Sequence, residues 1–189
     1  MKRWRVSVLL ALLGGLTLSA QSINWQSIVN MPHPQHLAEE HLTAGQRHDV
    51  EQAILASNTV WDDCEGDNDW PHKIEVHRIN LGEGHFTLAE AGPGCARSGQ
   101  GANGAMWLLR WDAGKPVMIG DLDGWFDTVL PQAASGLHDI AVGWHDSADE
   151  FGLTLYRFNG KRYRLVDGTT VHCDDSSGHC VAAASARKP

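Results

Sequence analysis

Positive charge is scarce in this chain of 189 residues once its first twenty residues are set aside. Three of the fifteen Lys and Arg residues lie in that stretch and none of the 23 acidic residues does, which leaves twelve basic against 23 acidic side chains and a formal charge of −11 with His neutral. Nucleic-acid binding depends on Lys and Arg that neutralise phosphates. The charge balance therefore excludes nucleic acid as a partner and favours a cationic protein or metal ions.

A second long apolar segment is also missing, as are the sequence signatures of common catalytic sites. No run after residue 20 approaches the roughly 20 apolar residues that span a bilayer, so we expect no membrane insertion of the mature chain. The sequence has no Gly-x-Ser-x-Gly elbow and no zinc-enzyme histidine motif. The glycine-rich stretch 92–104 lacks the strand-loop-helix context of a phosphate-binding loop.

The first feature that is present is an export pattern. Three basic residues precede an apolar run over residues 6–18, and the small residues Ser19 and Ala20 follow it. That order is typical of a secretory signal peptide, and the run of ~13 residues is too short for a membrane-spanning helix. We expect residues 1–20 to be cleaved near Ala20 and the mature protein to be periplasmic or secreted.

All four cysteines lie in the mature part, an even number in an oxidising compartment. Three pairings are possible. We favour Cys173–Cys180, which closes a short loop and leaves Cys64 to pair with Cys95. The alternative is a zinc site, although the spacing of Cys173 and Cys180 is wider than the two to four residues of a zinc knuckle.

The remaining chain predicts one domain of α+β class. Pro32 and Pro34 predict an irregular segment over residues 21–42. Thr43 followed three residues later by Gln46 is a capping box, which predicts a single N-terminal helix over about 44–57. The single domain extends over 43–181, and residues 182–189 form a frayed tail.

After the helix, apolar and polar residues alternate in short runs separated by turn residues. Seven to nine short strands in a mainly antiparallel β-sheet, sandwich-like or barrel-like, follow from this spacing. Residues 116–119 and 126–130 are expected as two separate strands, and Asn159-Gly160 predicts a two-residue type I′ hairpin turn.

Part of the second half of the sequence resembles a known group of proteins. The stretches that carry the resemblance are 106–111, 135–146 and 152–163. Over roughly Cys95 to Tyr163 the chain is similar to an uncharacterised group of small exported bacterial proteins with no assigned function. The resemblance implies one compact exported domain and implies no chemistry.

A shorter stretch resembles the calcium loop of integrin-type propeller blades. Asp121, Asp123 and Asp127 stand where the later half of such a loop carries its ligands, but Ile119 occupies the first acidic position. The resemblance implies Ca²⁺ as a candidate cofactor, which needs six to eight oxygen ligands. The alternative is a polar turn between strands.

The densest acidic run surrounds Cys64 and suggests a ligand surface. A Cys64–Cys95 bridge would bring this run next to the glycine-rich loop, with a tryptophan at each end of the run. The candidate surface consists of Trp61, Asp62, Asp63, Asp67, Asp69 and Trp70. The alternative is a solvated loop held by the bridge.

Eleven histidines invite a metal or catalytic interpretation. His138 and His145, each followed by Asp, bracket one predicted strand, but at ~3.3 Å per residue they lie some 20 Å apart and cannot share an ion. His41 and His48 match no zinc signature either. We therefore expect the histidines to be surface residues.

These observations predict an exported, non-catalytic binding or interaction module of unknown ligand, whose partner is a basic protein or an envelope glycan. One alternative is a metal-dependent or carboxylate-based hydrolase that acts on envelope polymers, whose catalytic residues the sequence leaves unknown. Another is a calcium-stabilised structural domain.

Overall fold

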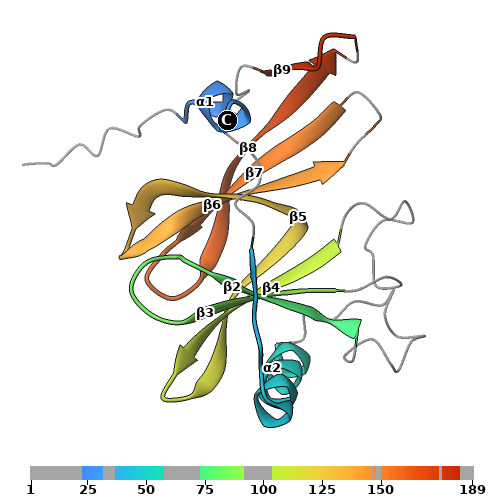
Figure 1. The fold of residues 1–189 in the computed structure, drawn as a ribbon. Coiled ribbons are helices and arrows are strands. Elements are labelled where there is room, and N and C mark those ends of the chain that lie inside the picture. Colours follow the sequence, from blue (N-terminus) through green and yellow to red (C-terminus); the bar gives the residue numbers. More distant parts are fainter. Residues whose placement is uncertain are drawn as a thin grey trace, which may run out of the picture.

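The computed structural model describes residues 23–31, 37–57, 73–91, 104–145, 147, 150–174 and 176–183. Within these residues, nine strands form one antiparallel sheet in which neighbours in sequence are neighbours in space (Figure 1). The elements in chain order are α1 (Trp25–Val29), β1 (Ala38–Glu39), α2 (Ala44–Ala56), β2 (Glu75–Ile79), β3 (Phe86–Glu90), β4 (Gly104–Asp112), β5 (Lys115–Ala134), β6 (Leu137–His145), β7 (Glu150–Phe158), β8 (Tyr163–Asp174) and β9 (His179–Ala182). The predicted α+β class with seven to nine antiparallel strands is confirmed.

Strand β5 belongs to both halves of the sheet. Residues 115–124 pair with β4 and residues 125–134 pair with β6. Between them Gly124 has a φ of +122°, and a Cβ atom there would lie 1.9 Å from the carbonyl oxygen of Gly143. Only glycine tolerates both the positive φ and the close approach. The sheet turns at Gly124 and folds over itself. The two strands predicted over 116–119 and 126–130 are therefore parts of one bent strand, β5.

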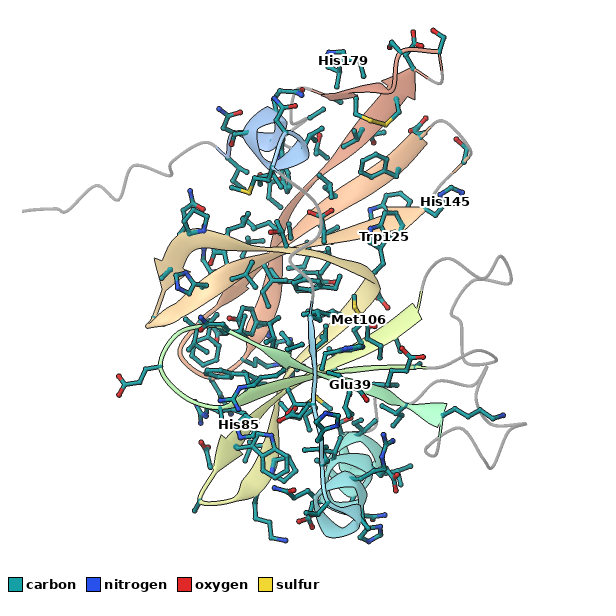
Figure 2. All side chains as sticks on the ribbon, in the orientation of Figure 1. Glu39, His85, Met106, Trp125, His145 and His179 are labelled. Carbon is teal, nitrogen blue, oxygen red and sulfur yellow. A yellow bond between two sulfur atoms is a disulfide. The ribbon has the colours of Figure 1, made fainter. Side chains whose placement is uncertain are left out.

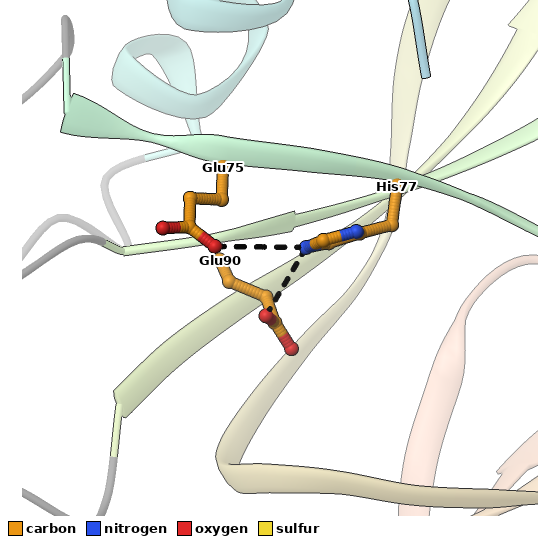
Figure 3. A group of neighbouring side chains, drawn as sticks. All are labelled: Glu75, His77 and Glu90. Atoms are coloured by element: carbon orange, nitrogen blue, oxygen red, sulfur yellow. Dashed lines mark ion pairs between the residues drawn. The ribbon is translucent and has the colours of Figure 1, made fainter. Parts of the chain in front are cut away.

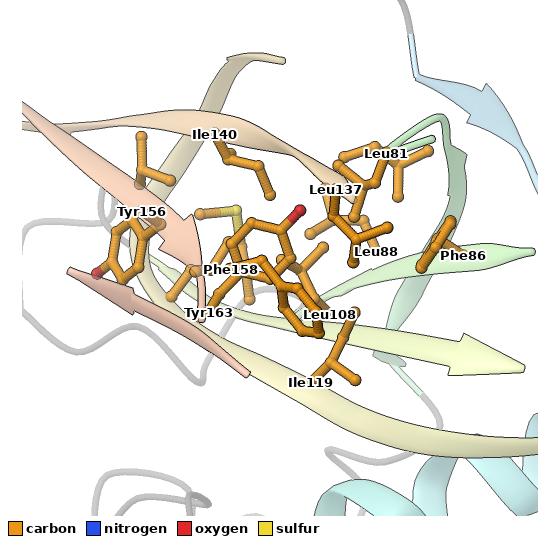
Figure 4. Packing of buried hydrophobic residues seen from close by; sticks show 14 residues of the cluster. Leu81, Phe86, Leu88, Leu108, Ile119, Leu137, Ile140, Tyr156, Phe158 and Tyr163 are labelled. Carbon is orange, nitrogen blue, oxygen red and sulfur yellow. The ribbon is translucent and has the colours of Figure 1, made fainter. Parts of the chain in front are cut away.

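The folded sheet encloses its main core between the two halves. Leu88 and Leu108 from the first half meet Ile140 and Phe158 from the second, all at most 4% exposed (Figure 4). The β2–β3 turn closes one end, because the amide of His138 donates a hydrogen bond of 2.9 Å to the carbonyl oxygen of Leu81. The arrangement is barrel-like at this end.

Each helix covers the outer face of one half. Helix α2 packs Val50 and Ile54 onto the first half, and α1 packs Trp25 and Ile28 onto the second. Figure 1 shows the two helices at opposite ends of the molecule. The sheet therefore has apolar side chains on both faces of both halves.

Helix α2 begins where the capping box predicts. The Thr43 side chain accepts a hydrogen bond from the amide of Gln46 at 3.2 Å, and the Gln46 side chain accepts one from the amide of Thr43 at 3.0 Å. These reciprocal bonds satisfy amides that the first turn leaves unpaired.

Helix α1 lies within the segment predicted to be irregular. Asn24 caps it by accepting a hydrogen bond from the Ser27 amide at 3.2 Å. The Gln26 side chain donates to the carbonyl oxygen of Cys180 and accepts from the amide of Ala182, at 3.1 and 3.0 Å. A side-chain amide thus pairs with edge strand β9, which explains why this short helix is held in place although proline follows it closely.

Two predictions near the C-terminus have different outcomes. The Cys173–Cys180 disulfide is confirmed, between residues directly opposite each other on β8 and β9. The type I′ turn at Asn159-Gly160 is wrong, because Gly160 has a positive φ and Asn159 does not. The Asn159 side chain instead accepts hydrogen bonds from the amides of Lys161 and Arg162, which holds a wider loop closed by the Phe158–Tyr163 pair.

None of the helices in the described ranges is long and apolar enough to cross a membrane.

Candidate metal centre

Three side chains with metal-binding atoms gather at one end of strands β2 and β3. Glu75 and His77 lie two residues apart on β2, and successive side chains of a strand alternate between its faces, so both project from the same face. Glu90 on β3 is directly opposite Glu75 in the antiparallel register. Side chains of directly opposite residues share a face. The hairpin therefore brings two carboxylates and one imidazole together (Figure 3).

The distances between these groups suit a shared cation. Nε2 of His77 lies 3.4 Å from Oε2 of Glu90 and 3.9 Å from Oε2 of Glu75. One ligand atom from each of the three residues lies within 4.8 Å of the other two. A metal ion about 2.0–2.2 Å from nitrogen and oxygen ligands fits between atoms spaced in this way.

The imidazole is half-buried, and apart from the ion-pair contacts of Nε2 with the two carboxylates its ring nitrogens make no hydrogen bond among the described residues. The His77 side chain is 21% exposed, and both ring nitrogens are shielded from solvent. A buried polar atom without a partner destabilises a fold by about 1–3 kcal/mol. A ligand that accepts the nitrogen lone pair would remove this cost.

A second histidine–carboxylate group, formed by Glu40 and His85, is held by several hydrogen bonds and serves as a comparison. Glu40 is buried and its carboxylate bonds both the His85 ring and the Thr87 hydroxyl. The Trp111 indole donates to the same hydroxyl at 2.8 Å and stacks on His85. Both carboxylate oxygens, the Thr87 hydroxyl and the Trp111 indole therefore have a partner, and the network joins the residue after β1 to β3 and the residue before it. His77 has no comparable set of hydrogen bonds.

Negative charge accumulates around His77. Burial raises the pKa of Glu90 above its ordinary value of 4.5, nearby His77 opposes this rise, and the charge of Glu75 adds to it. Glu39 on β1 is directly opposite His77 and 80% exposed, so it supplies a third carboxylate at the rim. Figure 2 shows Glu39 in the lower half of the molecule, above α2. A divalent cation would relieve the repulsion among these carboxylates.

The set of donors selects for a class of metal. Imidazole nitrogen suits zinc and other first-row transition ions, whereas calcium takes oxygen ligands. Three protein ligands also leave at least one coordination position open for water or another ligand. The residues present therefore fit a zinc-class ion.

The three aspartates of the predicted calcium loop lie on strand β5. Asp121 is opposite Trp107 and Asp123 is opposite Ala105, so both face the side covered by α2. Asp127 lies beyond the corner, in a register irregularity of the β5–β6 pair, and is 7% exposed. Within the described ranges, these three do not form a group of ligand atoms like that at His77.

Other predicted site residues lie outside the described residues. They are Trp61, Asp62, Asp63, Asp67, Asp69 and Trp70, together with Cys64 and Cys95. Of the histidines, His138 and His145 lie near opposite ends of β6, as the strand spacing predicts, and His41 precedes α2.

The sequence alone places two of the three residues of the candidate centre on one face of a strand. Glu75 and His77 occupy alternate positions of a run whose strand period is clear, which places them on one face. Glu90 lies thirteen residues beyond His77, and only the hairpin register brings it opposite Glu75. Motif spacing alone does not reveal such a ligand.

Comparison of the chain with protein-family models, with curated proteins and with solved structures finds no match.

Proposed function

We propose that this protein is an exported binding module that holds a zinc-class divalent metal ion at Glu75, His77 and Glu90. The observation that carries the proposal is the half-buried His77 ring, whose solvent-shielded nitrogens make no hydrogen bond among the described residues and whose Nε2 faces two carboxylates. A bound ion would satisfy one ring nitrogen and neutralise the charge that Glu75 and Glu90 share. Each residue would supply one ligand atom.

Binding at this site depends on pH in a defined direction. Ligands must be deprotonated to hold a metal, and the raised pKa of Glu90 means that this carboxyl keeps its proton to higher pH than an ordinary glutamate. Metal binding therefore releases protons and weakens as the pH falls. The surplus of acidic residues raises the local cation concentration at the surface.

Two further features support a role outside the cytoplasm. The Cys173–Cys180 disulfide is compatible with an oxidising compartment. The N-terminal sequence has the order of charge, apolar run and small residues of a secretory signal. A periplasmic or secreted module would meet metal ions there without competition from the thiols of the cytoplasm.

The test is isothermal titration of the oxidised mature protein, after treatment with EDTA, with Zn²⁺ and separately with Ca²⁺. We expect one Zn²⁺ per chain and no comparable Ca²⁺ binding. His77→Ala should weaken Zn²⁺ binding by about a hundredfold, since even residues that only support metal ligands change affinity 10- to 100-fold.

His172→Ala is the matched control. His172 also lies opposite a glutamate on a neighbouring strand, with Nδ1 3.6 Å from Oε2 of Glu150, but this pair belongs to no three-residue group of ligand atoms in the described part of the chain. Equal loss of binding in the two variants would mean that Zn²⁺ binds to surface histidines in general, and the proposal would be abandoned. A Ca²⁺ response without a Zn²⁺ response would favour the calcium-stabilised domain instead.

A second candidate is a metal-dependent hydrolase that acts on envelope polymers. The open coordination position left by three protein ligands favours it, because catalytic zinc sites keep one for water. Zn²⁺-loaded protein should then release soluble fragments from purified cell-wall polymer, and His77→Ala should not. Tight Zn²⁺ binding without turnover would leave the binding module as the function.

A further inference from the structure

A cavity of about 360 Å³ lies between α1 and the outer face of the second half of the sheet. Ile28 and Met31 line it from the α1 side, and Leu130 and Leu155 line it from β5 and β7. Its volume is within the range of pockets that hold small organic ligands, and apolar side chains line one part of it while the polar residues Asn24, Ser27 and Gln132 line another. It lies in the other half of the molecule from the Glu75–His77–Glu90 group.

One ion pair also lines the cavity. Asp139 on β6 is 1% exposed and accepts three hydrogen bonds from Arg157 on β7, of 2.8 to 3.2 Å, from Nε and Nη2. Both residues line the cavity. The buried carboxylate therefore holds the guanidinium in one orientation, and Asp139 is already neutralised.

The guanidinium has capacity left for a ligand. Nη1 of Arg157 makes no hydrogen bond within the described residues, and the Arg157 side chain is 45% exposed. A guanidinium presents its donors in a planar fork that suits carboxylate oxygens. The cavity thus combines an apolar wall with a fixed cationic donor.

We infer that this cavity binds a small organic carboxylate with an apolar body, whose carboxylate accepts hydrogen bonds from Nη1 of Arg157 and whose chain packs against Ile28, Met31, Leu130 and Leu155. Asp139 is a positioning residue, because it holds Arg157 and has no donor to offer the ligand. The inference is independent of the proposed metal centre.

Three probes of equal chain length test the inference: octanoate, octanol and octylammonium. Each is titrated into the oxidised mature protein, and binding is measured by calorimetry. We expect octanoate to bind about tenfold more tightly than octanol, since a hydrogen bond to a charged group has about that effect, and octylammonium to bind more weakly than either. Equal affinities for octanoate and octanol, or no binding of octanoate, would overturn the inference.

The variant Asp139→Asn/Arg157→Gln keeps a neutral pair of similar size and avoids leaving a buried charge alone. It should bind octanoate and octanol equally, and its circular dichroism should match that of the wild type. If this variant fails to fold, Ser27→Met in the cavity wall replaces it, because a larger side chain there excludes all three probes.

Arg110→Gln is the matched control. Arg110 makes a similar two-pronged ion pair with Asp112, at 2.8 and 2.7 Å, on the surface of the other half. This variant should keep the preference for octanoate. Retention of the preference in the double variant would refute the role of Arg157. Loss of the preference in Arg110→Gln would show that the carboxylate is recognised outside this cavity and would likewise overturn the inference.

Discussion

Glu90 is the residue at which ligand binding and stability oppose each other most directly. Its carboxylate is needed for a metal ion, but burial and the neighbouring Glu75 disfavour its charged form. Natural binding sites often carry such a cost, because the groups that hold a ligand are not the groups that best stabilise the empty fold.

Glu90→Gln should therefore stabilise the metal-free protein and abolish Zn²⁺ binding. Folding raises the pKa of Glu90, so the folded state holds the proton more strongly, and the destabilising effect of its charge develops as the pH rises from the ordinary pKa of 4.5 through the raised one. The measurement is thermal melting in EDTA between pH 3.5 and pH 8. The variant should melt higher than the wild type at pH 8, and the two should converge at low pH. A variant that melts lower at pH 8 would contradict this account of the site.

At the scale of elements, β5 determines the shape of the sheet. Its two halves pair with different neighbours, and the change of direction requires the backbone of Gly124 to approach that of Gly143. The strand is continuous through the corner because its hydrogen-bond partners change from β4 to β6 at that point.

Gly124→Ala should be strongly destabilising. The positive φ strains any side chain, and the added methyl group would lie 1.9 Å from a backbone oxygen that cannot rotate away. We expect a loss of at least about 3 kcal/mol in the free energy of unfolding, measured in urea. Gly136→Ala is the control, because Gly136 has a φ of +88° but nothing within 4 Å of an added Cβ. Equal effects of the two substitutions would show that strain alone matters and that the close approach does not.

The capping box offers a test of helix α2 as an element. Thr43→Ala removes the side chain that accepts from the Gln46 amide and should lower the free energy of unfolding by about 1 kcal/mol. Thr43→Ser keeps the hydroxyl and should behave like the wild type. Chemical denaturation followed by circular dichroism distinguishes them, and an unchanged Thr43→Ala variant would mean that packing of α2 makes its cap dispensable.

At the scale of the whole molecule, the inner core makes the two halves one cooperative unit. Leu108 from the first half is fully buried in a cluster that contains Ile140, Tyr156 and Phe158 from the second. Neither half buries the inner face of its strands alone, so we expect both to unfold together.

Leu108→Ala should destabilise the entire domain by about 2–5 kcal/mol and leave a single transition. Urea unfolding is followed by tryptophan fluorescence and by circular dichroism, and the two curves should coincide. Leu165→Ala, at a site 57% exposed, should change stability by less than about 0.5 kcal/mol. Separate transitions by the two probes would contradict the single cooperative unit.

The sequence by itself determined the features that depend on residues close together in the chain. The capping box joins Thr43 to Gln46 three residues away, the period of two predicts the strands, and Cys173 and Cys180 are separated by only seven positions. The cleaved signal, with its removal near Ala20, remains a prediction because residues 1–22 lie outside the described residues.

Only the tertiary structure decided the features that join distant parts of the chain. Strand β5 turns because Gly124 meets Gly143, and α1 forms because Gln26 bonds strand β9 more than 150 residues away. Glu90 joins Glu75 and His77 only through the hairpin register. The physical reason is that local hydrogen bonds and periodicity act within a few residues, whereas packing selects among many long-range pairings that the same local patterns permit.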